Sequence, residues 1–485
     1  MHLAERAAAG RATGDAVPRS DGTRHRVRAR PKDSRPRPGR WAAGARQGVV
    51  FGYPSAVFER TALPNGPRVI TARLAGARSF TAEAHVLAGS RHEAPGQAGC
   101  AHFMEHLTFK GTRAYPTTRA LSEAVEGLGG TFNASTDRES TVYFVRVPSR
   151  HAATALQVLG ELVVRPNLDE TEIENERDVI VEEIRSYLDD PAEHVNVLFD
   201  LAIFGDTPLG REIAGSEESV RSLPATAIRE FWRTYYQPSN VVLAASGDLH
   251  HGEVVALAME AFGSGGRPIP GYLPAPAIPA GERSLRASRP STQAQLVLGV
   301  PALPRDHPDQ WTLSVLNAVL GDGMSSRLFL EVREELGLAY DVGSSIIAYS
   351  DAGVLSVYAG VDPGRIRPTI TAILAELARL RDQDVPGPEM TKVKAYLAGR
   401  LELRLDETRY LASWVGTQEA LHDRVMTPDE ALAAIDAVTI ADVRALAGRL
   451  FHDDALRLAV VAPAGKGRAL ESTLRIRAPR AQARR

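Results

Sequence analysis

Two histidines and a glutamate in the stretch His102-Phe103-Met104-Glu105-His106 have the residue types and spacing of a zinc hydrolase site. On a helix, His102 and His106 lie about 40° apart round the axis, so both imidazoles can reach one ion. With Glu105 at the edge of that face, the order is H-x-x-E-H, the inverse of the commoner H-E-x-x-H zinc motif. A zinc hydrolase needs two neutral imidazoles, a third protein ligand, an open position for water and a carboxylate beside that water. The stretch lacks only the third ligand. The alternative is a chance grouping on an ordinary amphipathic helix.

The third ligand must come from another element, and segment 169–188 is the candidate. Asp169 and Glu172 are spaced as a capping pair for the start of a helix. Apolar residues then recur at helical spacing and form one stripe: Ile173, Ile180, Ile184 and Tyr187. We therefore predict a helix over this segment.

Two carboxylates, Glu176 and Glu183, fall inside the apolar stripe, whereas Glu174 and Glu182 fall outside it and can be solvated. A carboxylate on a buried face is costly unless it is paired or binds a metal. We therefore expect Glu183, and not Glu182, to be the third ligand, with Glu176 supporting the site from one helical repeat away. The alternative is that both carboxylates pair with arginines across a domain face.

Strand and helix patterns surround the motif helix in the first half of the chain. Alternating apolar residues and turn residues predict a hairpin, a third strand, a second helix and a strand pair, at 57–61 with 68–71, 80–86, 117–128 and 129–136 with 141–145. If strand 129–136 is a sheet edge beside the metal, its free backbone groups can bind an extended peptide. The alternative is an ordinary internal hairpin.

The second half repeats the order of the first, with strands and helices at 293–300, 310–320, 326–336, 339–349 and 353–360. Segments 236–243 and 451–458 align without gaps, each after a helix and before an apolar strand. This predicts an α+β fold of two homologous domains, each a mainly antiparallel sheet packed with helices. The helix that corresponds to the motif helix carries Leu313 to Asn317 and no metal ligands, so we expect one metal per chain.

Length and composition indicate a soluble globular protein of more than one domain, with 485 residues, 44% hydrophobic and 24% charged. The net charge of −2 excludes a global attraction to nucleic acid or membrane. Residues 1–48 hold 12 basic and 4 acidic residues, which we interpret as a disordered tail. The alternative is an organelle-targeting or nucleic-acid-binding arm. A single cysteine, Cys100, excludes intramolecular disulfides. Without a membrane-length apolar run or a signal peptide, we expect a cytoplasmic protein.

The motif and its surroundings resemble the pitrilysin-type inverted zincin peptidases, above all the branch containing mitochondrial processing peptidase and its bacterial relatives. The matching residues are Gly99, Ala101, the motif itself, Phe109-Lys110-Gly111-Thr112, and Glu176-Arg177-Asp178-Val179-Ile180-Val181-Glu182-Glu183. The resemblance covers about Phe51 to Pro463. It implies that His102, His106 and Glu183 bind zinc, that Glu105 activates water, and that Glu176 is a second catalytic carboxylate. Asn133 and Ala134 resemble the family's substrate-binding strand.

The second half carries a further resemblance. Gly323-Met324-Ser325-Ser326-Arg327-Leu328-Phe329 and Val332-Arg333-Glu334-Glu335-Leu336-Gly337-Leu338-Ala339-Tyr340 resemble the segments that hold the family's substrate-binding pair, here Arg333 and Tyr340. Residue types alone favour a surface arginine on a helix and a tyrosine in a strand core.

The resemblance implies a zinc-dependent endopeptidase with one Zn²⁺ per chain, which hydrolyses extended or unfolded peptides enclosed in a chamber. Four such domains close as a clamshell in the family, so we expect a homodimer with sites shared between chains. The alternatives are a non-catalytic scaffold and one subunit of a heteromeric processing peptidase. The predicted parts are a tail, a catalytic zinc-binding domain, a linker, a substrate-binding domain and a second basic tail, at 1–48, 49–264, 265–286, 287–470 and 471–485.

Overall fold

The computed structural model describes residues 58–64, 66–267, 269–272, 274–275, 282–422, 424–467 and 469–477. The predicted tail 1–48 lies outside these residues, as does Asn65 of the predicted first turn. No helix in the described part combines the length and the apolar character that a membrane span requires.

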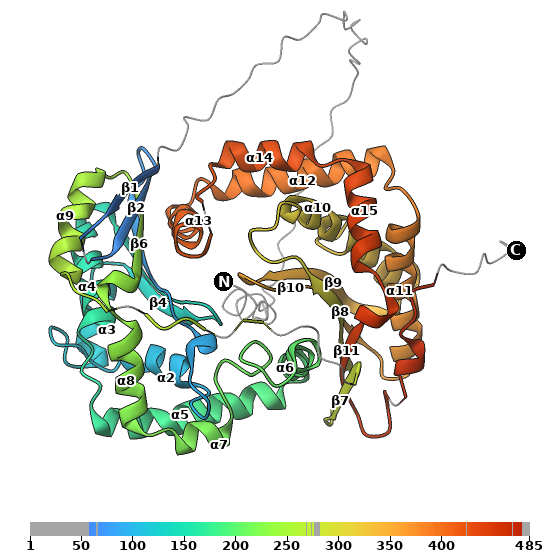
Figure 1. Ribbon diagram of the computed structural model, residues 1–485, viewed down its shortest axis with the longest axis horizontal. Coiled ribbons are helices and arrows are strands. Elements are labelled where there is room, and N and C mark those ends of the chain that lie inside the picture. The colour runs from blue at the N-terminus through green and yellow to red at the C-terminus, as the bar shows by residue number, and fades with distance from the viewer. Residues whose placement is uncertain are drawn as a thin grey trace, which may run out of the picture. The chain divides into compact units, whose positions relative to one another are not determined.

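The first half contains a six-stranded sheet and its helices (Figure 1). Its strands are β1 (Phe58–Ala62), β2 (Arg68–Arg73), β3 (Ser79–Val86), β4 (Thr131–Thr136), β5 (Thr141–Pro148) and β6 (Val241–Gly247). Its helices are η1 (Ser90–His92), α2 (Cys100–Thr108), α3 (Thr118–Glu126), η2 (Ser149–His151), α4 (Ala152–Val164), α5 (Glu170–Asp189), α6 (Pro191–Phe204), α7 (Glu217–Ser222), α8 (Ala225–Tyr235), η3 (Pro238–Asn240) and α9 (His251–Phe262).

The second half contains a five-stranded sheet and its helices. Its strands are β7 (Ser284–Ser288), β8 (Ala294–Ala302), β9 (Ala339–Ala348), β10 (Gly353–Val361) and β11 (Arg457–Ala462). Its helices are α10 (Gln310–Leu320), η4 (Phe329–Glu335), α11 (Ile366–Asp382), α12 (Gly387–Arg404), α13 (Thr408–Leu421), α14 (Pro428–Ala437), α15 (Ile440–Leu450), η5 (Asp453–Ala455) and η6 (Glu471–Thr473).

Five strands of the first sheet and the five strands of the second have the same topology, as the duplication predicted, and β1 is an additional edge strand. The first has the strand order β1-β2-β6-β3-β5-β4 and the second β7-β11-β8-β10-β9. In each sheet one strand from the end of the half, β6 or β11, pairs parallel with one neighbour and antiparallel with the other. All other strand pairs are antiparallel. The predicted α+β fold with two similar halves is therefore confirmed.

Period-two alternation along the central strands decides what each sheet face buries. In β3, Phe80, Ala82 and Ala84 point into the apolar core of the first half. The intervening Thr81 and His85 point to the opposite face, where they meet α13 from the second half. This face of the first sheet is thus covered by a helix of the second half.

The two halves exchange helices. Helix α13 packs on β6, β3 and β2 of the first sheet, and α6 packs on β11 and β8 of the second. Leu411 and Val415 of α13 bury against Ile70 and Val242, and Phe199 of α6 lies against Gly299 of β8. Each half therefore buries a sheet face of the other.

Gly416 is the point of closest approach between α13 and the first sheet. A Cβ at this position would overlap the imidazole of His85 and stand 2.7 Å from Cβ of Ala244. We expect Gly416→Ala to lower the free energy of unfolding by about 1–3 kcal/mol, the usual cost of overpacking a core.

Gly399 of α12 provides the matched control, because a Cβ there meets no atom within 4 Å. Gly399→Ala should raise stability by up to about 1 kcal/mol through helix propensity alone. Denaturant unfolding of both variants measures the difference, and equal stabilisation by the two changes would contradict the tight contact.

Several sequence predictions need correction. Asp169 is the N-cap of α5, but its side chain makes no capping hydrogen bond. The segment predicted as a linker to residue 286 already contains the start of β7 at Ser284. The predicted second tail, from residue 471, begins too early, because Leu474 and Ile476 are buried in the second core. These two apolar residues alternate with Arg475 and Arg477, so the segment was predicted as a basic tail.

Candidate metal centre

Helix α2 presents the two motif histidines towards α5. Its apolar residues Phe103, Met104 and Leu107 are buried in the first core, so the helix has one fixed orientation. That orientation leaves His102 and His106 on the side that contacts α5, with their rings 4.5 Å apart between centroids.

The start of α2 is held by a buried carboxylate. Glu93 accepts hydrogen bonds from the backbone N–H groups of Gly99 (3.1 Å) and Ala101 (2.9 Å). Burial raises the pKa of Glu93 to about 8, although these N–H groups act to lower it. Gly99 itself has φ 93°, and a Cβ there would lie 2.5 Å from the carbonyl oxygen of Ala214. The sequence reasoning did not identify Glu93, because its only signal is a carboxylate shortly before a helix without a polar N-cap.

Glu183 of α5 completes a group of three possible metal ligands. One carboxylate oxygen, Oε1, lies 3.8 Å from Nε2 of His102, and the other, Oε2, lies 3.4 Å from Nε2 of His106. One ligand atom from each residue lies within 4.8 Å of the others, and this is the only such group among the described residues. Ligands of a tetrahedral zinc, each about 2.0–2.2 Å from the ion, lie roughly 3.3–3.6 Å from one another. Two imidazoles and one carboxylate at these separations fit a zinc ion.

The three side chains keep 13%, 22% and 27% of their surface exposed, for His102, His106 and Glu183 respectively. The group is therefore partly open to solvent, as a catalytic metal site is and a closed structural site is not. Burial, aided by the neighbouring His106, lowers the pKa of His102 to about 4. The imidazole of His102 is therefore neutral at pH 7, as metal ligation requires.

Glu176 lies behind the group and holds His106. Its carboxylate oxygen is 2.8 Å from Nδ1 of His106, and its other oxygen is 2.5 Å from Nζ of Lys110. Burial acts to raise the pKa of Glu176, but the hydrogen bonds of His106 and Lys110 outweigh it and the pKa is lowered. Such a carboxylate fixes the orientation of the ring and makes it a better ligand. These contacts put Glu176 in the supporting position that the apolar stripe predicted, and its role as a second catalytic carboxylate, which the resemblance implies, stays a prediction.

Glu105 lies on α2, beside His106, and its side chain points to the end of β4. Thr136 donates its hydroxyl to Oε2 of Glu105 at 2.5 Å. Burial raises the pKa of Glu105 above its usual value, while the hydroxyl of Thr136 acts to lower it. A raised pKa makes the ionised carboxylate a stronger base than a free glutamate, which suits the role of general base that the sequence predicts for Glu105.

Strand β4, which carries Asn133 and Ala134, is the edge strand of the first sheet beyond β5. Of the two arrangements that the sequence left open, the structure has the sheet edge. Its last residue, Thr136, bonds to Glu105, so the open edge runs up to the ligand group. The side chain of Asn133 accepts a hydrogen bond from the N–H of Ala134 at 2.9 Å.

Arg333 and Tyr340 lie in the second half, on η4 and at the start of β9. The guanidinium of Arg333 lies 4.7 Å from the ring centre of Phe329 and 5.6 Å from that of Tyr340. Tyr340 is 75% exposed, so it is not the strand-core residue that residue types alone favoured. The two residues form a pair on the surface of the second half.

The sequence did not predict roles for four residues that support the site. Lys110, Thr136, Glu93 and Tyr187 each hold a site residue or its helix in place, and Tyr187 donates its hydroxyl to Glu183. Tyr187 had been assigned to the apolar stripe of α5. Its position four residues after Glu183, on the same helix face, was the available signal.

The fold and the site together define a class. Two duplicated α+β halves, with an inverted H-x-x-E-H helix facing a glutamate of a second helix, are the arrangement of the pitrilysin-type inverted zincins. Residues 68–217 match the family model described as Insulinase (Peptidase family M16), and residues 222–397 match that described as Peptidase M16 inactive domain. The chain belongs to peptidase family M16.

Curated relatives support this assignment over nearly their whole length. A protein of Streptomyces coelicolor named an uncharacterized zinc protease is 38% identical over 396 residues, which cover 80% of this chain and 86% of the relative. A Mycobacterium leprae protein with the same description is 36% identical, covering 87% of this chain and 95% of its own length. The Bacillus subtilis protein YmxG, also named an uncharacterized zinc protease, is 33% identical over 84% of this chain and 99% of its own length.

Solved structures show the same fold. A protease from Helicobacter pylori superposes with a TM-score of 0.80 at 24% identity, over 84% of this chain and all of that chain. A peptidase M16 inactive domain from Pseudomonas fluorescens superposes with a TM-score of 0.77 at 20% identity, over 84% of this chain and 98% of that chain.

Proposed function

We propose that the chain is a zinc-dependent endopeptidase that hydrolyses extended or unfolded peptides. The observation that carries the proposal is the convergence of His102, His106 and Glu183, with Glu105 beside them and an open sheet edge leading to them. Membership of family M16 and the zinc protease names of the relatives agree with it.

The three ligand residues would hold one Zn²⁺ per chain, which when bound would acidify a water molecule and polarise the scissile carbonyl. Glu105 would accept the proton of the attacking water at a carboxylate oxygen and return it to the leaving amine. Thr136 keeps that carboxylate oriented, and Glu176 with Lys110 keeps His106 oriented. The edge of β4 at Asn133 and Ala134 would pair with an extended substrate backbone.

Cleavage of an unfolded protein by the purified chain tests this function. We expect activity that a zinc chelator abolishes and that added Zn²⁺ restores. A chain that binds zinc but cleaves nothing alone would favour a subunit of a heteromeric peptidase. A chain that binds no zinc would favour a non-catalytic scaffold, a reading that the inactive-domain match of its second half keeps open.

We further propose that the active form is a homodimer that closes as a clamshell, with sites shared between its two chains. The polar and aromatic contacts of Arg333 and Tyr340 lie within the second half, and Tyr340 is exposed and available to a partner. In the partner's site these residues would donate hydrogen bonds to substrate carbonyls or to the developing oxyanion. Such an arrangement has twofold symmetry.

Mixing two inactive variants tests the shared site. Glu105→Gln chains lack the base and Arg333→Ala chains lack the donor, so each homodimer should be inactive. In a mixed dimer one site carries both defects and the other carries neither. About half of the activity of a wild-type dimer should therefore return in the fraction that has exchanged. If mass measurement shows exchange and no activity returns, the shared-site arrangement is wrong.

A further inference from the structure

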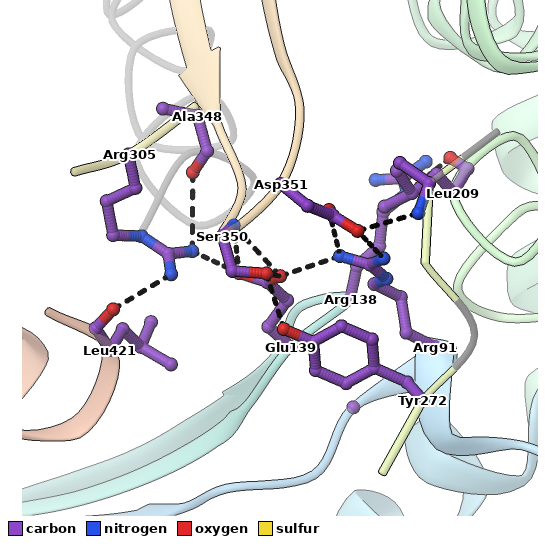
Figure 2. A network of polar contacts seen from close by, with 12 residues as sticks. Arg91, Arg138, Glu139, Leu209, Tyr272, Arg305, Ala348, Ser350, Asp351 and Leu421 are labelled. Carbon is purple, nitrogen blue, oxygen red and sulfur yellow. Dashed lines mark hydrogen bonds and ion pairs between the residues drawn. The ribbon is translucent and has the colours of Figure 1, made fainter. Parts of the chain in front are cut away.

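A cluster of charged and polar residues, in which Arg91 and Glu139 are buried and Ser350 and Asp351 are exposed, joins the two halves at the tips of two hairpins (Figure 2). The inter-half cluster consists of Arg91 and Glu139 from the first half and Arg305, Ser350 and Asp351 from the second. Glu139 lies in the turn between β4 and β5, and Ser350 and Asp351 lie in the turn between β9 and β10. These hairpins occupy equivalent positions in the two sheets, so the duplication brings their tips together.

Every charge in the inter-half cluster is paired. Glu139 accepts hydrogen bonds from Arg91 (2.7 Å), from the hydroxyl of Ser350 (2.7 Å) and from Arg305. Arg91 binds Asp351 through two nitrogens, each at 2.9 Å. The side chains of Arg91 and Glu139 are 0% and 4% exposed. The bidentate contact with Asp351 and the buried contact with Glu139 fix the guanidinium of Arg91 in one geometry.

Linker residues and backbone bonds complete the surroundings. The ring of Tyr272 lies 4.0 Å from the guanidinium of Arg91, and its hydroxyl bonds to Ser350. The N–H of Arg91 also donates to the carbonyl of Arg138 at 2.9 Å. The segment around Arg91 and the β4–β5 turn are therefore tied together by a contact within the first half itself.

Two short connections lead from the inter-half cluster to the metal-binding helix. In the first, Glu139 is three residues from Thr136, whose hydroxyl holds Glu105. In the second, Arg91 is two residues from Glu93, whose carboxylate holds the start of α2. A displacement of the β9–β10 turn would thus be passed on to α2 at two points, the start of the helix and Glu105.

A buried ion cluster is weak evidence for stability, because well-packed apolar residues at such sites are often at least as stable. Its distinguishing property is that it enforces one geometry. We propose that the inter-half cluster positions Glu105 and the start of α2, so that turnover in the first half requires the docked β9–β10 turn of the second. This rests on the proposed peptidase function, in which Glu105 is the base. Arg91, Glu139 and Asp351 are then positioning residues.

Asp351→Ala tests the proposal, because Asp351 is partly exposed and Arg91 keeps its bond to Glu139 in the variant. We expect kcat to fall about tenfold with KM within about twofold and zinc content unchanged, since small misplacements of reacting groups cost up to about 100-fold. Backbone hydrogen exchange should become faster at residues 89–101 and 136–140. If Asp351→Ala does not fold, Ser350→Ala, which removes one donor to Glu139, is measured in the same way.

Arg60→Gln is the matched control, because Arg60 of β1 makes another inter-half ion pair, with Glu419 of α13 at 2.8 Å. Glu419 keeps Arg68 as a partner at 3.3 Å, and no described contact links this pair to α2. The control should retain kcat and exchange. Equal losses in both variants, or an unchanged kcat and exchange in Asp351→Ala, would overturn the proposal.

Two further variants test the connection through Thr136. Thr136→Val removes the hydroxyl that holds Glu105 and should lower kcat as Asp351→Ala does, whereas Thr136→Ser should retain it. A loss in both Thr136 variants would overturn this connection. If the wild-type chain shows no peptidase activity, the proposed function fails, and hydrogen exchange still decides whether the inter-half cluster controls the order of α2.

Discussion

Glu105→Gln is expected to retain zinc and fold and to lose most turnover. The amide has nearly the same shape as the carboxylate and can still accept the hydrogen bond from Thr136, so α2 keeps its packing. The amide cannot accept the proton of the attacking water. Loss of a general base commonly lowers the rate about 10²–10⁴-fold.

The measurement is kcat on an unfolded protein substrate, with zinc content and thermal unfolding recorded on the same sample. Glu123→Gln is the control, because Glu123 lies on α3 with its side chain 64% exposed and pairs only with its helical neighbour Arg119 among the contacts described. Turnover near the wild-type value in Glu105→Gln would contradict the proposed mechanism. Loss of zinc in that variant would instead make Glu105 part of the ligand set.

Local periodicity accounts for what could be predicted from the sequence. The helical spacing of the apolar residues fixed which face of α5 is buried, and Ile173, Ile180 and Ile184 are buried there. Glu176 is buried on the same face, and Glu182 is exposed on the other. The repeated order of strands and helices predicted two similar sheets, which the structure confirms.

Contacts between distant segments could not be predicted in this way. An amphipathic helix has an apolar face whichever sheet it covers. The sequence pattern of α6 and α13 therefore could not show that each of them packs on the sheet of the other half. The inter-half cluster joins Arg91 to Asp351, residues 260 positions apart. Each of its members lies in a turn or a short helix without periodicity. Thr136 and Lys110 contact the site as single side chains, so no apolar periodicity marks either contact.

The choice of Glu183 over Glu182 gives the sharpest test of the metal centre. Glu183 faces both motif histidines, whereas Glu182 pairs with Arg185 and has 70% of its side chain exposed. The two residues are adjacent in the chain and identical in type. Their glutamine variants therefore differ only in position, and each serves as the control of the other.

We expect Glu183→Gln to lower zinc affinity by more than about 100-fold, because loss of even an outer-shell partner commonly costs roughly 10–100-fold. Glu182→Gln should bind zinc as the wild type does, since an exposed ion pair contributes little. Metal content after dialysis against a weak chelator measures both, and circular dichroism shows whether each variant is folded. Zinc loss confined to Glu182→Gln would show that the helix face was assigned wrongly. Zinc retained in both would place the third ligand elsewhere and remove the basis for the proposed peptidase site.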